Sequence, residues 1–350
     1  MDTLLRDLKH AVRSLVQDKG FTLTALLTLG VTIGAHTTVF SVVHSVLLEP
    51  LPFPEPERIV LLTNSYPGAG VPRASTGVPD YYDRLRALDV FEEQALYNFR
   101  GRSLEMQGLP ERIRGMQVTP SFFRLLRAKP ELGRTFTEAE GEIGNHQKVV
   151  LRHGLWQQLF SGRTDAVGQN LRIDGEPYEV VGVMPASFRF TDPETRLWTA
   201  RAFTDEQKSD DRRHSNNGEM IGRLLPGRTL EQAQAQIDAL NASNLERFPQ
   251  MREVLTNAGF TTIALSFPKD LVRDVARLLY LLWGGVFCVL LVGCVNLANL
   301  ALVRANVRLR ELSTRLALGA YYFPFTQDPD NGLSLVVKGH RRRHRAHRRE

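Results

Sequence analysis

The sequence contains few cysteines, and both lie in one apolar segment. Cys288 and Cys294 fall between residues 278 and 303, whereas the polar stretch from residue 49 to 277 has none. No disulfide can therefore stabilise that stretch, even in an oxidising compartment. Because the two thiols are six residues apart, they lie on different faces of a helix, and we expect both to be small buried hydrophobic side chains.

Sequence motifs for independent chemistry are also missing. The chain has no GxxxxGK[ST] phosphate loop, no GxSxG nucleophile elbow, no HExxH metal motif and no paired CxxC. His146, His153 and His214 share one polar region, but their spacings lack metal-site character. We therefore expect no enzymatic activity, no metal and no cofactor, and any hydrolysis of ATP has to come from another chain.

The formal charge of +6 does not indicate nucleic-acid binding, because the excess is concentrated at one end. Residues 321–350 hold six Arg and one Lys against two Asp and one Glu, a net charge of +4. The rest of the chain is nearly balanced, so no nucleic-acid partner is expected.

Two long runs without Asp, Glu, Lys or Arg are present, at residues 21–48 and 278–303. Each exceeds the roughly 20 residues that a helix needs to cross a hydrocarbon core of about 30 Å. We predict transmembrane helices over residues 20–48 and 275–303, and a globular domain over residues 49–274. The first run is about twice as long as the apolar part of a signal peptide, which favours an uncleaved anchor.

Basic residues flank both runs on the sides away from the globular domain. Lys19 precedes the first run and Arg304 follows the second, each with further Lys or Arg residues nearby. Short basic flanks stay in the cytoplasm, so both termini are predicted inside and the globular domain outside. Residues 1–19 combine an apolar stripe with basic residues, which predicts an amphipathic helix on the inner membrane lipids. Packing of that helix on another protein is the alternative.

Small and polar side chains in the two runs predict contacts with other helices. Gly30 and Gly34 form a small-xxx-small pair that lets a second helix approach closely. Asn296 and Asn299 place two amides in hydrocarbon, where they need hydrogen-bonding partners. We therefore expect transmembrane helix packing at all four positions.

Between the runs, strand-like and helix-like segments alternate, which predicts an α+β domain. Prolines between residues 50 and 56 predict an extended exit from the first helix. Asp174-Gly175 predicts a β-hairpin turn, and Thr229 predicts the N-cap of a helix. We expect strands at residues 59–62, 148–151, 170–173, 178–184 and 260–267, and helices at 79–88, 119–126 and from 230 onward.

A series of short motifs runs through the polar middle and continues after the second run. They are Val118-Thr119-Pro120-Ser121-Phe122-Phe123, Gly133-Arg134-Thr135-Phe136, Gly154-Leu155-Trp156, Val167-Gly168, Val180-Val181-Gly182-Val183-Met184-Pro185, Leu225-Pro226-Gly227-Arg228-Thr229-Leu230, Arg308-Leu309-Arg310-Glu311-Leu312 and Arg315-Leu316-Ala317-Leu318-Gly319-Ala320. In this order they resemble MacB/FtsX-like ABC transporter permeases. The opening of the chain also fits, especially the duplicated acidobacterial type, with Leu4, Arg6, Asp7, Leu8 and Lys9 followed by Ala11, Arg13, Ser14 and Leu15. The resemblance covers residues 1–320.

This resemblance implies a permease subunit of the bacterial inner membrane with a periplasmic MacB-like core domain. That domain would have a porter-like part and an inserted second subdomain near residues 145–200. The subunit would dimerise, or pair with a missing second half, and dock on a separate ABC ATPase. Nucleotide-driven closure of the ATPase would move the helices and the periplasmic domain, for export or for mechanotransmission.

The charged residues after the second run are the expected contact with that ATPase. Arg308, Arg310, Glu311 and Arg315 lie in a predicted cytoplasmic coupling segment, residues 304–320. A charge near the bilayer centre costs about 2.5–3.5 kcal/mol on insertion scales, so this segment must stay at the cytoplasmic surface. A simple basic anchor is the alternative, although it does not account for Glu311.

The resemblance stops after Ala320. Residues 321–350 contain no stretch long enough to cross a bilayer and end in a His/Arg-rich run. We interpret them as an atypical basic tail without defined structure, produced by a truncated gene or a shifted reading frame. A functional tail that binds the anionic inner leaflet is the alternative.

The leading hypothesis is thus a permease subunit, or an N-terminal fragment of one, in which case the fragment could be non-functional. A two-span membrane sensor with an extracytoplasmic ligand-binding domain is the rival from another class. An envelope hydrolase is a third and weaker hypothesis, because no catalytic constellation is visible.

Overall fold

The structure is a computed structural model that describes residues 19–44, 51–106 and 109–317. The expected amphipathic helix before residue 19 and the tail after residue 320 lie outside these residues. The chain divides into two compact units, Met1–Leu48 with Ala276–Glu350 and Glu49–Val275. The first unit contains both long apolar runs, and the second contains the α+β domain.

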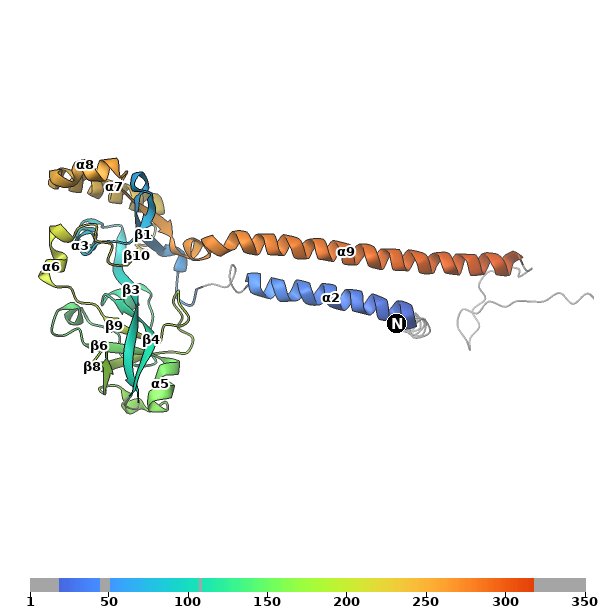
Figure 1. Cartoon of the computed structure of the whole chain (residues 1–350), viewed down its shortest axis with the longest axis horizontal. Helices are drawn as coiled ribbons and strands as arrows, with labels where there is room; N and C mark the ends of the chain where they lie inside the picture. The colour runs from blue at the N-terminus through green and yellow to red at the C-terminus, as the bar shows by residue number, and fades with distance from the viewer. Residues whose placement is uncertain (1–18, 45–50, 107–108, 318–350) are drawn as a thin grey trace, which may run out of the picture. The chain divides into compact units, whose positions relative to one another are not determined.

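Two helices are long and apolar enough to cross a membrane, α2 (Lys19–Val43) and α9 (Phe267–Ala317) (Figure 1). Within the first unit, the buried residues of α9 recur every seven positions, at Leu279, Val286 and Gly293. A Cβ atom at Gly293 would lie 2.6 Å from the hydroxyl oxygen of Thr32 in α2. A seven-residue repeat is typical of helices that pack at a small crossing angle.

Threonines are frequent in α2, and several of their hydroxyls are hydrogen-bonded within the helix. Thr24, Thr28 and Thr32 each donate to the carbonyl oxygen four residues earlier, at 2.9, 2.8 and 2.7 Å. A polar group in hydrocarbon costs free energy unless it is hydrogen-bonded. These bonds therefore make a threonine-rich helix compatible with a lipid environment.

The second unit is built on one 11-stranded sheet with the order β11-β1-β10-β3-β4-β9-β6-β8-β5, to which β2 adds beside β1. Because β7 pairs with both β3 and β8, strands β3, β4, β9, β6, β8 and β7 close into a ring. The strands are β1 (Ile59–Tyr66), β2 (Val71–Ala74), β3 (Phe91–Met106), β4 (Leu109–Val118), β5 (Leu132–Gly133), β6 (Lys148–Arg152), β7 (Asn170–Ile173), β8 (Glu176–Met184), β9 (Leu197–Ala200), β10 (Glu219–Leu224) and β11 (Thr261–Ser266).

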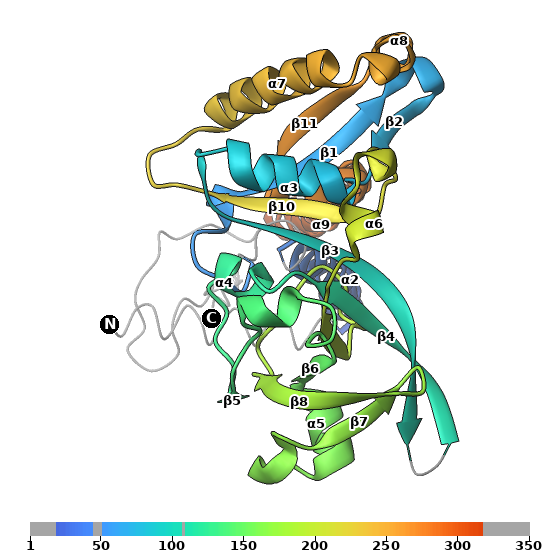
Figure 2. The ribbon, with the colours of Figure 1, turned by 90° about the vertical axis from the view of Figure 1, so that its left-hand side faces the viewer.

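Helices cover this sheet in two places, and Figure 2 shows α3 and α7 on the same side of strands β11, β1 and β10. Tyr81 of α3 and Ile237 of α7 bury their side chains in a core with Leu62, Met220 and Ala264 of those strands. A second core lies inside the strand ring, and a third packs around α4. The helices are α3 (Val78–Ala87), α4 (Phe122–Leu125), α5 (His153–Phe160), α6 (Asp205–Lys208), α7 (Leu230–Arg247) and α8 (Pro249–Asn257).

The α+β class predicted from the sequence is confirmed, and so are its two strongest local signals. Asp174 and Gly175 both have positive φ, 54° and 85°, in the turn between β7 and β8, as a two-residue hairpin turn requires. Thr229 caps α7, because its hydroxyl accepts a hydrogen bond from Gln232 N at 3.3 Å and Gln232 Oε1 accepts one from Thr229 N.

The helix predicted at residues 119–126 is wrong in extent, since α4 has only four residues. Thr119 does not cap it. Instead the Thr119 hydroxyl accepts a hydrogen bond from Leu96 N of β3 at 3.0 Å. The threonine is therefore used to tie the chain to the sheet, and the helix begins later, at Phe122.

Candidate functional site

The strands that lead to the two apolar helices are hydrogen-bonded neighbours. β11 ends at Ser266 and α9 begins at Phe267, so no linker separates the sheet from the second helix. β1, which follows the first helix along the chain, pairs antiparallel with β11 over six residue pairs from Val60↔Ser266 to Ser65↔Thr261. Both connections of the domain to the apolar helices therefore belong to one strand pair.

The start of α9 is fixed to the domain by an aromatic contact and an ion pair. Phe267 is 2% exposed, and its ring stacks on Phe190 with centroids 5.5 Å apart. Arg73 of β2 donates two hydrogen bonds to Asp270, at 2.7 and 2.9 Å. A bidentate pair of this kind fixes orientation as well as distance, so the first turn of α9 cannot rotate freely against the sheet.

The segment before β1 is held by a fully buried arginine of β10. The Arg223 guanidinium donates to the carbonyl oxygens of Leu125, Pro54 and Glu55, at 2.5, 3.0 and 3.3 Å. Burial lowers the pKa of Arg223, and the positive charge of Arg127 adds to this effect. Glu55 has a positive φ of 49°, an uncommon backbone conformation that these bonds help to maintain.

A second buried arginine, Arg84 of α3, contacts both strands of this pair. It donates to Asn64 Oδ1 of β1 at 2.7 Å, Thr262 Oγ1 of β11 at 2.8 Å and Thr76 Oγ1 at 2.9 Å. Burial lowers the pKa of Arg84, and the negative charge of Asp80 opposes that shift. One guanidinium thus bonds both strands that connect to the apolar helices.

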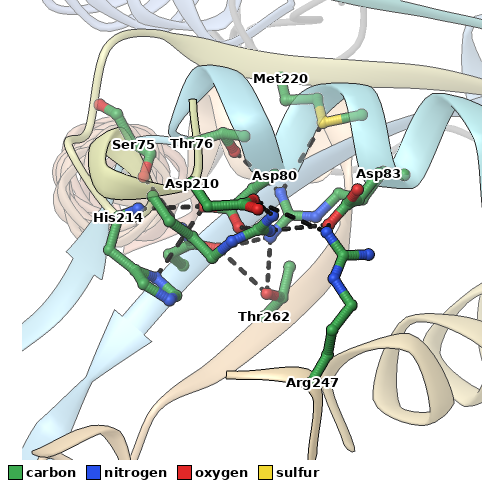
Figure 3. Close-up of polar contacts among 12 residues, drawn as sticks. Ser75, Thr76, Asp80, Asp83, Asp210, His214, Met220, Arg247 and Thr262 are labelled. Carbon is green, nitrogen blue, oxygen red and sulfur yellow. Dashed lines mark hydrogen bonds and ion pairs between the residues drawn. The ribbon is translucent and has the colours of Figure 1, made fainter. Parts of the chain in front are cut away.

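Arg213 extends this charged cluster to the surface helices. It donates to Asp80 at 2.9 Å, Asp83 at 2.7 Å and Asp210 at 2.5 Å, and Arg247 of α7 lies 3.6 Å from Asp83 (Figure 3). Removal of one partner from a buried ion pair costs about 3–5 kcal/mol, because the other charge is left unpaired. The cluster therefore fastens the 210–214 segment and α7 to α3.

His214 completes the cluster. It has a positive φ of 62°, its Nδ1 atom lies 2.9 Å from the Tyr66 hydroxyl, and Asp80 Oδ2 lies 3.9 Å away. Burial raises the pKa of Tyr66 to about 12. The cavity between the cluster and α7–α8 holds only about 10 Å³, which is about the volume that one water needs. The cluster is thus a structural connection and not a substrate pocket.

The position of His214 predicts a loss of stability in mild acid. Burial lowers its pKa below the usual 6.5, and Asp80 opposes the shift only in part. The unfolded chain then binds this proton at a higher pH than the folded chain, so stability falls as pH drops through about 6.5. We expect the urea midpoint of unfolding to depend less on pH between 7.5 and 5.5 in His214→Asn than in the wild type, since asparagine tolerates the positive φ at this position. Unfolding is followed by tryptophan fluorescence.

His146 lies outside the cluster and supplies the control. His146→Asn should keep the pH slope of the wild type, which for one proton is at most about 1.4 kcal/mol per pH unit. Equal slopes for His214→Asn and the wild type would show that His214 does not contribute.

The positions expected to pack against other helices are not used in the contact between α2 and α9. Gly30 and Gly34 are exposed, with no atom within 4 Å of a Cβ placed on either, and Asn296 and Asn299 are exposed as well. Arg310 is exposed on the last turns of α9, whereas the side chains of Arg308, Glu311 and Arg315 lie outside the part of the structure that is described.

The expectation of buried cysteines was wrong. Cys288 and Cys294 are both exposed on α9, because the seven-residue seam at Leu279, Val286 and Gly293 passes between them. Among the described residues, no group of three or more His, Cys, Asp or Glu side chains is arranged to hold a metal ion.

The arginine contacts with β1 and β11 were not predicted from the sequence. A signal was present in α3, where Asp80, Asp83 and Arg84 are interleaved with apolar residues at helical spacing. Charges on the buried side of a short helix indicate a polar core.

The neighbouring strands of this sheet lead into two helices that are long and apolar enough to cross a membrane, which makes the α+β unit a domain carried on a pair of candidate membrane helices. Residues 22–240 match the MacB-like periplasmic core domain family. The match covers more than half of the chain, and the chain belongs to this family.

The chain is also similar to bacterial export proteins and to a solved periplasmic domain. The chain is 25% identical over 205 residues to a probable syringafactin export ATP-binding/permease protein, SyfD, of Pseudomonas syringae, covering 58% of this chain and 29% of that protein. It is 28% identical over 190 residues to the macrolide export ATP-binding/permease protein MacB of Nitrosomonas europaea, covering 54% and 27%. The periplasmic region of MacB from Actinobacillus actinomycetemcomitans aligns with a TM-score of 0.46 at 13% identity, covering 66% of this chain and 98% of that one. The chain spans about a third or less of the length of these curated relatives.

Proposed function

We propose that the chain is a permease subunit of a MacB-type ABC exporter, in which ATP hydrolysis by a partner moves the periplasmic domain. The observation that carries the proposal is the direct pairing of β1 with β11, the two strands that continue toward the apolar helices. A relative shift of those helices acts on one hydrogen-bonded ladder, whose six residue pairs resist sliding. Family membership favours this function over the sensor hypothesis.

Three arginines and one aromatic side chain give this coupling its stiffness. Arg73 and Phe267 hold the start of α9, Arg223 holds the segment before β1, and Arg84 bonds both strands to α3. Displacement of the helices would therefore move the sheet and α3 as one body. Mechanotransmission without export would use the same connections.

The remaining contacts of the permease follow from its two apolar helices. Both termini would be cytoplasmic, because basic residues flank the helices on that side. The exposed faces at Gly30, Gly34, Asn296 and Asn299 would receive helices of a second permease chain or half, as small and amide side chains do in membranes. The ABC ATPase would dock on the coupling segment at residues 304–320.

Co-purification tests the proposal. The full chain in detergent should co-purify with the ABC ATPase encoded beside its gene, and Arg310→Glu should lower recovery about tenfold, equivalent to about 1.4 kcal/mol. Arg228→Glu, at an exposed position of the periplasmic domain, is the matched control and should leave recovery unchanged. Absence of the ATPase from the wild-type preparation, or equal loss in both variants, contradicts the proposal.

A further inference from the structure

One face of β3 runs from one hydrophobic core to another across a polar stretch. Leu96 belongs to the core under α3 and α7, and Leu104 belongs to the core inside the strand ring. Since alternate residues of a strand share a face, Asn98, Arg100 and Arg102 lie on this face between the two cores. No apolar side chain of β3 fills the gap between Leu96 and Leu104.

The neighbouring strands add a third arginine to the same face. Gln117 of β4 pairs with Asn98 of β3 and with Thr199 of β9. Arg102 reaches across to Thr199 and donates to its hydroxyl at 3.0 Å. Arg201 follows two residues later and continues the ladder, because its N–H donates to Val118 O at 2.9 Å. Arg100, Arg102 and Arg201, called here the arginine saddle, thus share one patch of the sheet.

The arginine saddle has fewer carboxylate partners than guanidinium groups. Asp174 accepts from Arg102 at 2.6 Å, and although burial opposes it, the Ser103 N–H and Arg102 lower its pKa. Among the residues that the structure describes, neither Arg100 nor Arg201 forms an ion pair with a carboxylate. Among the described residues, the three guanidinium groups of the saddle thus have one carboxylate ion-pair partner, Asp174, which is bonded to Arg102.

Arg201 is the most unusual member, because it is 9% exposed and lacks a counter-charge. Its Nη2 atom donates to Asn217 O at 3.0 Å, and its guanidinium lies 4.8 Å from the ring of Phe203. Its Nη1 atom is buried without a hydrogen-bond partner, as is Nε of Arg102. Burial, reinforced by the positive charge of Arg100, lowers the pKa of Arg201 to about 10. Burying an unpaired charge is costly, and an anion at this position would remove that cost.

We propose that the arginine saddle is a binding site for an oxyanion, the carboxylate or phosphate group of a ligand. Arg100 is exposed and would meet the anion first, whereas Arg102 and Arg201 supply buried guanidinium donors. Guanidinium groups bind carboxylate and phosphate through paired N–H donors. The site does not depend on the transport function, because it needs neither an ATPase nor membrane passage.

Thermal unfolding of the full chain in detergent tests the site. Inorganic phosphate and acetate replace chloride at constant ionic strength and pH, so that general screening stays the same. We expect the wild-type Tm to rise by about 3 °C as the better anion saturates the site. The anion that acts at the lower concentration identifies the group as phosphate or carboxylate.

Variants separate a binding role from a structural one. Arg100→Ser and Arg201→Met should lose the anion-dependent rise, and Arg201→Met should keep or increase the Tm in chloride, because an unpaired buried charge is removed. Arg112→Ser is the matched control, because Arg112 lies over Gly101 on the opposite face of the same hairpin. The proposal is overturned if neither anion raises the wild-type Tm, or if all three variants respond as the wild type does. If Arg201→Met does not fold, Arg100→Ser on the exposed rim decides alone.

Discussion

Gly182→Ala is expected to lower the free energy of unfolding by at least about 3 kcal/mol, as strong overpacking does. A Cβ at residue 182 would lie 2.1 Å from the carbonyl oxygen of Arg134. The opposite residue is Gly133, which has a φ of +71° and whose own Cβ would lie 2.3 Å from Val181 O. Since backbone meets backbone on both sides, β5 and β8 would have to separate. The hydrogen bond from Arg134 N to Val181 O, now 2.9 Å long, would be lost.

Gly154→Ala supplies the comparison, because Gly154 lies in α5 with open space around it. Alanine is favoured over glycine in a helix by roughly 0.5–1 kcal/mol, so this variant should be as stable as the wild type or more so. Urea unfolding of both variants, followed by tryptophan fluorescence in the same detergent, measures the difference. A loss at Gly182 of less than about 1 kcal/mol would contradict the close backbone approach.

Gly133 and Gly182 show what a sequence can and cannot predict about this fold. Both occur in the motifs that resemble the MacB family, so their presence was noted without a physical reason. The reason is the contact of β5 with β8, and it joins residues 133 and 182, which are far apart in the sequence. The Asp174-Gly175 turn and the Thr229 cap were predictable because each depends on residues within four positions.

The hairpin of β3 and β4 was missed for a different reason. Its sequence places charged residues on both faces, with Arg100 and Arg102 on one and Arg112 and Arg114 on the other. Strand prediction depends on a face of apolar residues every second position, and this hairpin bridges two cores across a polar patch. The alternation of apolar and polar residues therefore did not predict these two strands, because the arginine saddle interrupts it.

Of the candidate site, only the points where the chain enters and leaves the domain were predicted from the sequence. Apolar runs and basic flanks predicted where the chain enters and leaves the domain, because these signals are continuous in sequence. The contacts that fix those ends bring together α3, β1, β10 and β11 through Arg84 and Arg223. The charges among the apolar residues of α3 were a signal for Arg84, whereas a single arginine in a strand, such as Arg223, gives no sign of being buried until the tertiary structure is known.

Arg223→Met is expected to lower the free energy of unfolding by about 3 kcal/mol, since it removes a fully buried guanidinium and leaves three carbonyl groups, one of them buried, without their donor. Arg223 is 0% exposed and supplies hydrogen bonds to Leu125, Pro54 and Glu55. Methionine fills much of the same volume, so the loss reports the hydrogen bonds more than a cavity. Urea unfolding of the full chain measures the total effect.

Arg127→Met is the matched control, because Arg127 pairs with the side chain of the same Glu55 from a position that is 39% exposed. Exposed ion pairs contribute about 0–1 kcal/mol, so this variant should be close to the wild type. The distribution of the effect is as informative as its size. If Arg223 anchors the segment that joins the first helix to β1, Arg223→Met should be cut by a protease between residues 51 and 58 at urea concentrations that leave β6 and β8 protected. Uniform cleavage along the domain, or equal losses for both arginines, would mean that the anchor is not local, and the stiff connection on which the proposed coupling depends would be absent.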